Sequence, residues 1–462
     1  MNAPPCPWQV AAGSWPHLPG LVTPTRTWTF AEWNDEVARR AAELVSSGWH
    51  RGDRIGLRDG GTAEFTFWLA AAMRVGLVAC VTSPRWSPRQ LAQAASCSSW
   101  RGWMDMGVAT ACCPAPVYSI SKQADPQTLD RVPGLSTILF SSGSSGDPKA
   151  IAHRLDAHLA SADGANRNLP LGPGDRWPVS LPMSHVSGLG ILFRCLLSGA
   201  TVLLPEHRGP LESQLEEWQP THLSLVPTQL KRLLDRNLGP PSRLRGVLVG
   251  GAALPAGLRL RAAAMHWPLV TTYGLTEMGS QVTATSPGAE EAELATCGRI
   301  LSGRELKVSD QGEILVRGRA RFEGFVRDAT LVSTFDNDGW YATGDSGFLD
   351  RDGLLRVTGR RDLMFISGGE NCFPEEIENG LLELPGIHHA CVVAIPHPEF
   401  GQRPFAFVDA ETWSPALWRA GLAELLPRFK IPDHFAPWPS DMPLKPNRAR
   451  LSEWAVERLA EA

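Results

Sequence analysis

The chain has 462 residues, 43% of them hydrophobic, so it can bury a large core and is long enough for about two domains or more. Its 44 basic and 48 acidic residues give a formal net charge of −4 and form no basic block, which argues against nucleic acid as a partner. Nine cysteines without a CxxC pair favour a reducing compartment over a disulfide-stabilised, secreted protein.

The amino terminus, MNAPPCPW, has neither a charged start nor an apolar run before a cleavage site. The apolar stretch from Phe65 to Met73 ends at Arg74, well short of a membrane span. We therefore expect a cytoplasmic protein without a membrane span, either alone or as a homo-oligomer.

Helices and short strands alternate from the start of the chain. Thr29 and Glu32 form a capping-box signal, and the apolar periodicity behind them predicts a helix that ends at Gly48. The strand RIGL begins at Arg54, and a helix over 62–75 is followed by the strand LVACV. This alternation is typical of parallel sheets covered by helices.

Further apolar runs end in Gly, Ser or Pro, as short strands do. They are TILFSSG at Thr137, WPVSLP at Trp177, TVLLP at Thr201, LSLVP at Leu223, GVLVGG at Gly246 and LVTTYG at Leu269. Because ligands of open α/β sheets bind outside the carboxyl ends of the strands, we expect the chemistry in the loops that follow these runs.

After about residue 300 the pattern changes to hairpins, RELKVSDQGEILVRG and FLDRDGLLRV, and then to a compact mixture of helices and strands. We therefore predict an α/β protein. Residues 1–359 form a large domain of layered α/β sheets with a small β-rich subregion, and residues 360–462 form a small α+β domain. No internal repeat or low-complexity segment is present in the sequence.

The segment SSGSSGDPK, from Ser141 to Lys149, directly follows a predicted strand. Glycines allow close backbone approach, while serine hydroxyls, amides and a lysine can hold phosphate oxygens. A Gly/Ser-rich loop alone is more often a flexible connector, and the lysine spacing departs from the Walker pattern. The position after a strand and the Pro-Lys pair favour phosphate binding.

The segment YGLTE, from Tyr273 to Glu277, also follows a strand. It offers an aromatic face for a base, a hydroxyl for an oxyanion and a hard carboxylate for magnesium. Alone it would more often be an ordinary turn with a buried tyrosine. Together and in this order, the two segments resemble the phosphate loop and signature of the adenylate-forming superfamily, which includes acyl-CoA synthetases, luciferases and peptide-synthetase adenylation domains.

Three later segments are similar to further elements of that superfamily. YATGD resembles the ribose-binding segment that ends in Asp345, and GRRD resembles the interdomain hinge, with Arg360 near the ribose and Asp362 as the pivot. SGGEN resembles the coenzyme A side of a small, mobile C-terminal domain. Read without the resemblance, these segments are ordinary turns and a helix start.

The superfamily also has an adenylation lysine near its carboxyl terminus, usually within GKxxR. Here the segment reads PLKPNR, so Lys445 and Arg448 keep the spacing but Leu444 replaces the glycine. A competing register puts Ala449 at the lysine position. This departure leaves adenylation less well supported by the sequence than nucleotide binding.

Within the superfamily, LPMSHVSGLG, LSLVPTQLKRLL, LVGGAALP and ISGGEN are closest to the o-succinylbenzoate:CoA ligase subgroup of menaquinone and phylloquinone synthesis. The resemblance implies that His185 lies at the mouth of an acyl pocket and that Gly250, Gly251 and Ala252 form a flat wall. A buried structural histidine and a plain strand-to-helix turn are the alternative interpretations.

Arg194 interrupts an apolar run that follows His185, and a cation there is costly without an anionic partner. It could hold the second carboxylate of o-succinylbenzoate, or it could lie on a solvated helix face or pair with a protein acid.

The resemblance thus implies an ATP-dependent ligase with Mg²⁺ at Glu277 that forms an acyl-adenylate and then an acyl-CoA. The implied catalytic residues are Lys445, His185, Thr276 and Glu277. The implied coenzyme A contacts are Gly368, Gly369 and Glu370. The implied nucleotide contacts are Ser141, Ser142, Gly143, Ser144, Ser145, Gly146, Lys149, Gly250, Gly251, Ala252, Tyr273, Gly274, Thr276, Asp345 and Arg360. A ligase for another aryl or fatty acid, or a nucleotide-binding protein without adenylation activity, remains an alternative.

Overall fold

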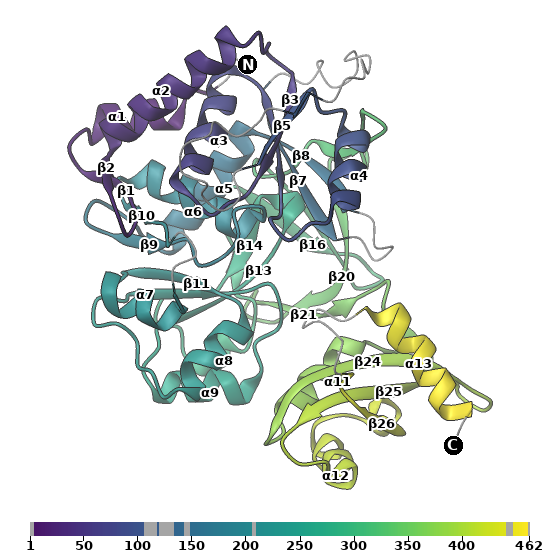
Figure 1. Cartoon of the computed structure of the whole chain (residues 1–462). Helices are drawn as coiled ribbons and strands as arrows, with labels where there is room; N and C mark the ends of the chain where they lie inside the picture. Colours follow the sequence, from purple (N-terminus) through teal and green to yellow (C-terminus); the bar gives the residue numbers. More distant parts are fainter. Residues whose placement is uncertain are drawn as a thin grey trace.

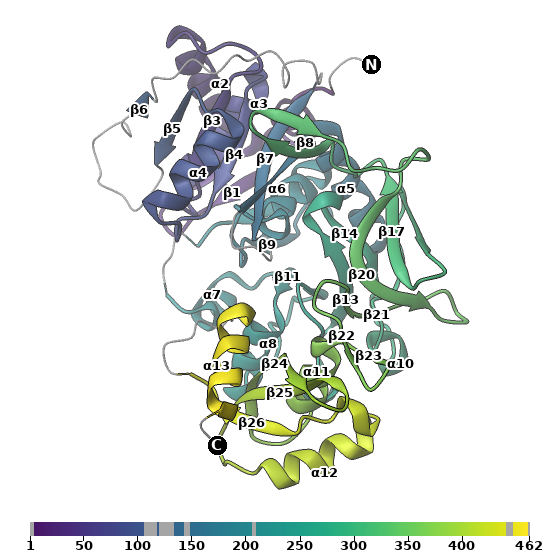
Figure 2. The ribbon, with the colours of Figure 1, turned by 90° about the vertical axis from the view of Figure 1, so that its right-hand side faces the viewer.

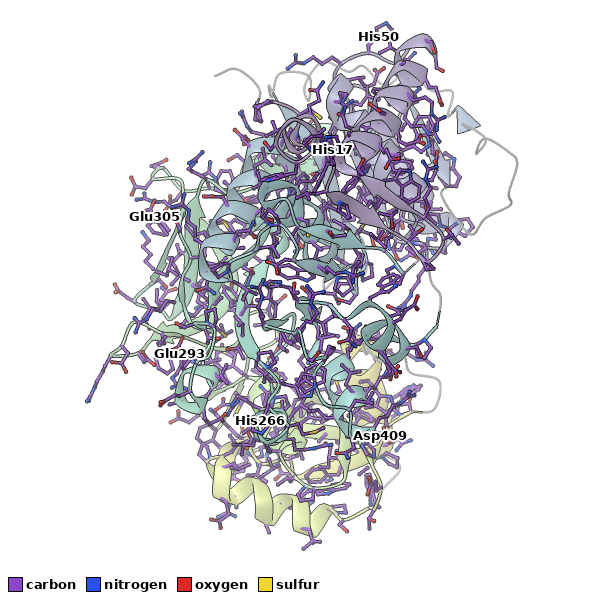
Figure 3. All side chains as sticks on the ribbon, turned by 90° about the vertical axis from the view of Figure 1, so that its left-hand side faces the viewer. His17, His50, His266, Glu293, Glu305 and Asp409 are labelled. Carbon is purple, nitrogen blue, oxygen red and sulfur yellow. The ribbon has the colours of Figure 1, made fainter. Side chains whose placement is uncertain are left out.

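The computed structural model describes residues 4–105, 118–119, 134–142, 148–205, 209–439 and 447–460. Helices cover a series of β-sheets, and the N-terminal helices lie far from the C-terminal region (Figure 1). Figure 3 labels His17 and His50 towards one end of the molecule and Asp409 near the other. The predicted α/β class, with a large first part and a smaller second one, is confirmed.

The largest sheet runs in the order β19-β18-β8-β7-β4-β3-β5-β6. Its strands span Thr330–Val332, Gly324–Arg327, Pro148–Arg154, Leu135–Ser142, Val78–Thr82, Arg54–Arg58, Gly102–Asp105 and Tyr118–Ser119. The strands β5, β3, β4 and β7 pair in parallel, as predicted, whereas β8 returns antiparallel to β7. The segment that joins β7 to β8 is too short for the crossover that a parallel pair needs.

The two helices predicted for this part of the chain, α2 and α3, lie within two residues of their expected bounds. Thr29 caps α2 through a reciprocal capping box with Glu32, and Gly76 ends α3 with a φ of +80°. The apolar faces pack into one core that includes the fully buried Trp33, Phe65 and Phe193. The helices of this part are α1 (Pro7–Ser14), α2 (Phe30–Ser46), α3 (Ala63–Val75), α4 (Pro88–Ser98), α5 (Leu155–Asn168) and α6 (Val186–Ser198).

A small sheet in the order β2-β1-β10-β9 and a larger one in the order β11-β12-β13-β14-β15 follow. The first contains Thr27–Thr29, Pro19–Val22, Thr201–Leu203 and Arg176–Pro178. The second contains His222–Leu225, Gly246–Val249, Leu269–Leu275, Ser280–Ala284 and Arg299–Ile300. The helical elements near the second sheet are α7 (Leu211–Trp218), α8 (Pro227–Asp235), α9 (Ala256–Ala264), α10 (Glu291–Leu294) and the 3₁₀ helix η2 (Thr276–Met278).

The β-rich subregion expected after residue 300 is an antiparallel sheet in the order β16-β17-β20-β21 (Figure 2). Its strands span Arg304–Val308, Glu313–Gly318, Tyr341–Leu349 and Leu355–Arg360. Both predicted hairpins are present, and Gly312 supplies the positive φ of +76° in the first turn.

The C-terminal region has its own sheet, in the order β23-β22-β25-β24, with β26 added beside β25. Two cores lie on it, and in one of them Leu451 and Ala455 of the last helix pack against Val393 and Phe407. Its strands span Glu370–Cys372, Phe365–Ser367, Gly401–Ala410, Ile387–His397 and His434–Pro437. Its helical elements are α11 (Pro374–Leu382), α12 (Pro415–Leu425), α13 (Arg448–Ala460) and the 3₁₀ helix η3 (Arg428–Lys430). Of the helices in the described ranges, none is long and apolar enough to span a bilayer.

Candidate active site

The two ends of the predicted phosphate loop lie on neighbouring strands. Ser141 and Ser142 end β7, β8 begins at Pro148, and Ser141 pairs with Lys149 across the two strands. The Lys149 side chain is exposed. The predicted contacts between these ends, Gly143, Ser144, Ser145 and Gly146, lie outside the described residues.

A tyrosine, an aspartate and an arginine from three predicted segments meet in one hydrogen-bonded group. Tyr273 of β13 donates from Oη to Oδ2 of Asp345 on β20 at 2.6 Å, and Arg360 of β21 donates to the same carboxylate at 3.2 Å. Burial raises the pKa of Asp345 above its ordinary value, although Tyr273 and Arg360 oppose this by bonding to the charged form. The structure therefore brings together the residues expected around adenine and ribose.

Thr276 and Glu277 lie on η2, at the end of β13. The Oη of Tyr341 donates to Oε1 of Glu277 at 3.1 Å. Burial raises the pKa of Glu277 above its ordinary value of 4.5, while the bond from Tyr341 and the charges of Lys149 and Arg360 lower it. The carboxylate predicted to hold magnesium thus lies within electrostatic reach of the lysine of the phosphate loop.

Two glycines approach a neighbouring strand closely: Gly250, directly after β12, lies against β13, and Gly274 of β13 lies against β14. A Cβ on Gly250 would lie 2.8 Å from Cγ2 of Thr272, and one on Gly274 would lie 2.1 Å from the carbonyl oxygen of Ser280. Gly251 has a φ of +82°, and Ala252 after it is exposed. A larger side chain at Gly250 would therefore press on β13, and one at Gly274 would force β13 away from β14; the close approach at Gly250 fits the predicted flat wall.

His185 lies just before helix α6 and Arg194 lies within it, and the two side chains differ in burial. His185 is the exposed residue that precedes α6, while Arg194, more than two turns further on, is 3% exposed. Nη2 of Arg194 donates to Oε1 of Gln281 at 2.7 Å, and its guanidinium lies 5.2 Å from the ring centre of Trp177. An exposed polar side chain therefore lies at the N-terminus of α6, and a buried cation lies further along the same helix.

The buried guanidinium of Arg194 lacks a protein counter-charge in the described part of the chain. Its hydrogen-bonded side-chain partner there is the neutral Gln281, no ion pair within 4.0 Å joins it to a carboxylate there, and its Nε has no hydrogen-bond partner there. Burial, and then the charge of Arg304, lower its pKa to about 10. Burial excludes the alternative of a solvated helix face for Arg194, and among the described residues no acid pairs with it.

The predicted hinge and coenzyme A segments lie in and before the C-terminal region. Nε of Arg360 donates to Oδ1 of the exposed Asp362 at 3.1 Å. Gly368 and Gly369 form the turn between β22 and β23, with φ values of +60° and +87°, and Glu370 after them is exposed. The turn is held by a bond from the Gly368 amide to the carbonyl oxygen of Phe400 at 2.9 Å.

The predicted adenylation lysine, Lys445, lies outside the described residues. Arg448 donates from its two terminal nitrogens to the two carboxylate oxygens of Glu378 at 2.6 and 2.9 Å, and also to the carbonyl oxygen of Val392. These bonds join α13 to α11 and β24. Arg448 is therefore committed to the fold of the C-terminal region.

Two partners of the site were missed by sequence reasoning. Tyr341, the first residue of YATGD, lies four residues before Asp345 on one strand and so shares its face. That spacing was a usable signal. Gln281 had none, because its amide reaches both Arg194 and Thr272, residues from α6 and β13, and only the packed structure brings these together.

Comparisons with known proteins agree with this geometry. The model of the AMP-binding enzyme family matches residues 8–326, and that of the AMP-binding enzyme C-terminal domain matches residues 376–448. The chain is 38% identical over 331 residues to 2-succinylbenzoate–CoA ligase of Salmonella typhimurium, covering 70% of each chain.

Two solved structures of o-succinylbenzoate coenzyme A synthetase from Bacillus subtilis are also similar. The complex with the acyl-adenylate intermediate OSB-AMP has a TM-score of 0.85 at 26% identity and covers 98% of both chains. The complex with ATP and a magnesium ion has a TM-score of 0.84 at 26% identity, covering 97% of this chain and all 100% of that one. The family match over most of the chain, together with the bonded group at Tyr273, Asp345 and Arg360, makes this protein a member of the AMP-binding enzyme family.

Proposed function

We propose that this chain is an ATP-dependent acid–thiol ligase that converts 2-succinylbenzoate into 2-succinylbenzoyl-CoA through an acyl-adenylate. The name of the Salmonella typhimurium relative supports the overall reaction. The ligands of the two Bacillus subtilis structures, OSB-AMP and ATP with magnesium, support the intermediate and the nucleotide. ATP, coenzyme A and Mg²⁺ are then its cofactors and co-substrates.

In this proposal the nucleoside is held by residues that the chain has already oriented. Tyr273 packs its ring on adenine, and its hydroxyl keeps the Asp345 carboxylate in place for the two ribose hydroxyls. Arg360 bonds to the same carboxylate and supports its charged form. Because these groups are fixed before ATP arrives, little ordering is required on binding.

The phosphates lie between the loop strand and η2. Lys149, Ser141 and the hydroxyl of Thr276 contact the phosphate oxygens, and Glu277 is the carboxylate for the metal. In the described residues no group of three or more His, Cys, Asp or Glu side chains could hold a metal, which fits an ion held by one carboxylate, water and phosphates. Bound magnesium would neutralise charge on the transferred and leaving phosphates.

Arg194 is the observation that carries the choice of acid. The substrate has two carboxylates, and only one becomes an anhydride with AMP, so the other needs a partner wherever water is excluded. The buried Arg194, with an unpartnered Nε and no carboxylate close by among the described residues, offers that partner. The aromatic ring then packs on the wall at Gly250, Gly251 and Ala252, with His185 at the entrance.

Two chemical steps follow from this arrangement. A carboxylate oxygen attacks the α-phosphorus of ATP and pyrophosphate leaves, with Lys445 stabilising the developing charge. The sulfur of coenzyme A then attacks the acyl carbon and AMP leaves. We assign residues 1–359 to the large domain and 360–462 to the small one, which rotates about Asp362 so that Gly368, Gly369 and Glu370 face the coenzyme.

The cellular setting is part of the proposal. The seven cysteines of the described residues are all free thiols, which fits the reducing cytoplasm. ATP, coenzyme A and the diacid are the expected partners there, and a homo-oligomer is compatible with this function.

A ligation assay tests the proposal directly. Purified protein is given ATP, Mg²⁺ and coenzyme A with o-succinylbenzoate, benzoate or a medium-chain fatty acid, and thioester formation is followed. We expect the diacid to give the highest kcat/KM. Preference for benzoate or the fatty acid would overturn the substrate, and absence of ATP–pyrophosphate exchange with every acid would overturn adenylation.

A further inference from the structure

A buried histidine joins the phosphate-loop strand to the signature segment. His153 lies on β8, four residues after Lys149, and has no exposed surface. Side chains four residues apart on a strand share one face, so His153 and Lys149 point to the same side of the sheet. On that side, Nε2 of His153 lies 2.8 Å from the backbone carbonyl oxygen of Thr276.

The chemistry of this contact fixes the state of the imidazole. A carbonyl oxygen only accepts hydrogen bonds, so Nε2 must carry the proton and donate it. Burial lowers the pKa of His153 to about 4, which leaves the ring neutral, and Nδ1 has no partner among the described residues. His153 is therefore a neutral donor whose hydrogen bond runs to the carbonyl oxygen of Thr276, while the backbone of Ile151 on its own strand also acts to raise its pKa.

The segment that receives this bond has little structure of its own. The helix η2 has only three residues, and the Gly279 amide caps it by donating to the carbonyl oxygen of Thr276. Its other supports come from outside, because Phe322 donates to the carbonyl of Glu277 at 2.8 Å and Ser161 donates to that of Gly279 at 2.9 Å. Of these supports, only His153 comes from the strand that carries Lys149.

We propose that His153 is a positioning residue for adenylate formation. Its bond holds the Thr276 hydroxyl and the Glu277 carboxylate in register with Lys149, so that both sides of the phosphate site keep a fixed separation. This deepens the proposed function and rests on its assignment of Thr276, Glu277 and Lys149 to the phosphates. Catalysis by charge stabilisation depends on such fixed geometry.

The chain offers a matched control in His158. It is also buried, stacks on His153 with 5.0 Å between ring centres, and stacks on Phe193 at the same distance. Its Nε2, however, lies 2.7 Å from the hydroxyl of Thr137 and does not reach η2. A purely structural histidine stack would make the two positions equivalent.

The test compares His153→Leu, His153→Gln and His158→Leu with the parent protein. We expect His153→Leu to lower kcat for ATP–pyrophosphate exchange about tenfold and to raise the Mg²⁺ requirement severalfold, because one fixed donor is lost. Thioester formation from supplied acyl-adenylate should change little. His153→Gln, whose amide can still donate, should restore most of the exchange, and His158→Leu should lower only the melting temperature.

The outcomes separate this inference from the proposed function. Failure of the parent to exchange pyrophosphate with any acid would overturn the proposed function, and Mg²⁺-dependent ATP binding, measured by calorimetry, then tests His153 alone. Equal losses in both half-reactions for His153→Leu and His158→Leu would overturn the positioning role. So would a His153→Leu protein whose Mg²⁺ dependence of ATP binding equals that of the parent.

Discussion

The proposed nucleotide side of the site, at Asp345 and Glu277, and its proposed acyl side, at Arg194, differ in how their charged groups are paired. On the nucleotide side, Asp345 and Glu277 each accept a hydrogen bond from a tyrosine hydroxyl, and cations lie close by. On the acyl side, the buried Arg194 has a neutral amide as its hydrogen-bonded side-chain partner. Among the described residues, the first set of charges has protein partners, whereas Arg194 has no carboxylate partner, and we propose that the ligand supplies it.

We infer from this difference that the nucleotide side orients ATP, whereas the acyl side selects the acid. Groups that are bonded before ATP arrives bind it in one geometry, whatever acid follows. A buried cation without a counter-charge is costly, and an anionic ligand that reaches it recovers that free energy, whereas a neutral one does not. Changes on the nucleotide side should therefore affect every acid equally, and changes at Arg194 should affect the diacid alone.

Loss of the adenylation lysine should give the largest effect. We expect Lys445→Ala to lower acyl-adenylate formation by about 10²- to 10³-fold for every acid, because a charge that stabilises the transition state is removed. Thioester formation from supplied acyl-adenylate should stay near the parent rate. Single-turnover measurement of each half-reaction checks this. Adenylate formation at the parent rate would overturn this assignment, and Arg448 and Arg450 would then be substituted in turn.

A rigid residue at the proposed hinge should impair the coenzyme A step and spare adenylation, which is the reverse of the effect expected for Lys445→Ala. Asp362→Pro fixes φ at the proposed pivot, so adenylation should survive while the coenzyme A step falls by an amount on the order of 10²-fold through misplacement. Asp362→Ala removes one of the two carboxylates that Arg360 contacts but leaves φ free, and should have a smaller effect. Equal losses in both half-reactions for the proline variant would argue for misfolding or for another hinge.

The proposed acyl side can be tested by a substitution that leaves ATP binding unchanged. Arg194→Leu should raise KM for o-succinylbenzoate by the equivalent of about 1–3 kcal/mol, because a charged hydrogen bond to the second carboxylate is lost. KM for ATP should hardly change, and KM for benzoate, which has no second carboxylate, serves as the control. An unchanged KM for the diacid would remove Arg194 from the site and favour a plain aryl acid.

Features of the fold that depend on residues close together in the sequence, such as helix caps and hairpin turns, could be predicted. The capping box of Thr29 and Glu32, the helix over 62–75 and the two hairpins after residue 300 depend on local features, and each is present where it was expected. The motif residues converge because they end strands or line adjacent ones, which a sequence reader can anticipate.

Contacts between separate layers could not be predicted in the same way. The bond from Tyr341 to Glu277 joins β20 to η2, and that from Arg194 to Gln281 joins α6 to β14. Neither pair shares a local pattern, because the distance between the partners is set by how sheets and helices pack. The role of Lys445 stays a prediction that rests on spacing alone.

The smallest predicted effect is a shift in pH dependence on the nucleotide side. A neutral carboxylic acid is a poor ligand for magnesium, so kcat/KM for MgATP should fall as the pH drops through the raised pKa of Glu277. The hydroxyl of Tyr341 donates to the charged form and lowers that pKa. Tyr341→Phe should therefore raise the pKa further and move the acidic limb of the profile to higher pH.

The matched substitution Tyr273→Phe separates this effect from a general loss of order. Tyr273 supports the charged form of Asp345, so its removal should also move the acidic limb upward. Mg²⁺ competes with the proton only at Glu277, however. Raising the Mg²⁺ concentration should thus bring the limb of Tyr341→Phe back towards the parent position and leave that of Tyr273→Phe in place. Limbs that respond equally to Mg²⁺ in both variants would mean that Glu277 is not the metal carboxylate.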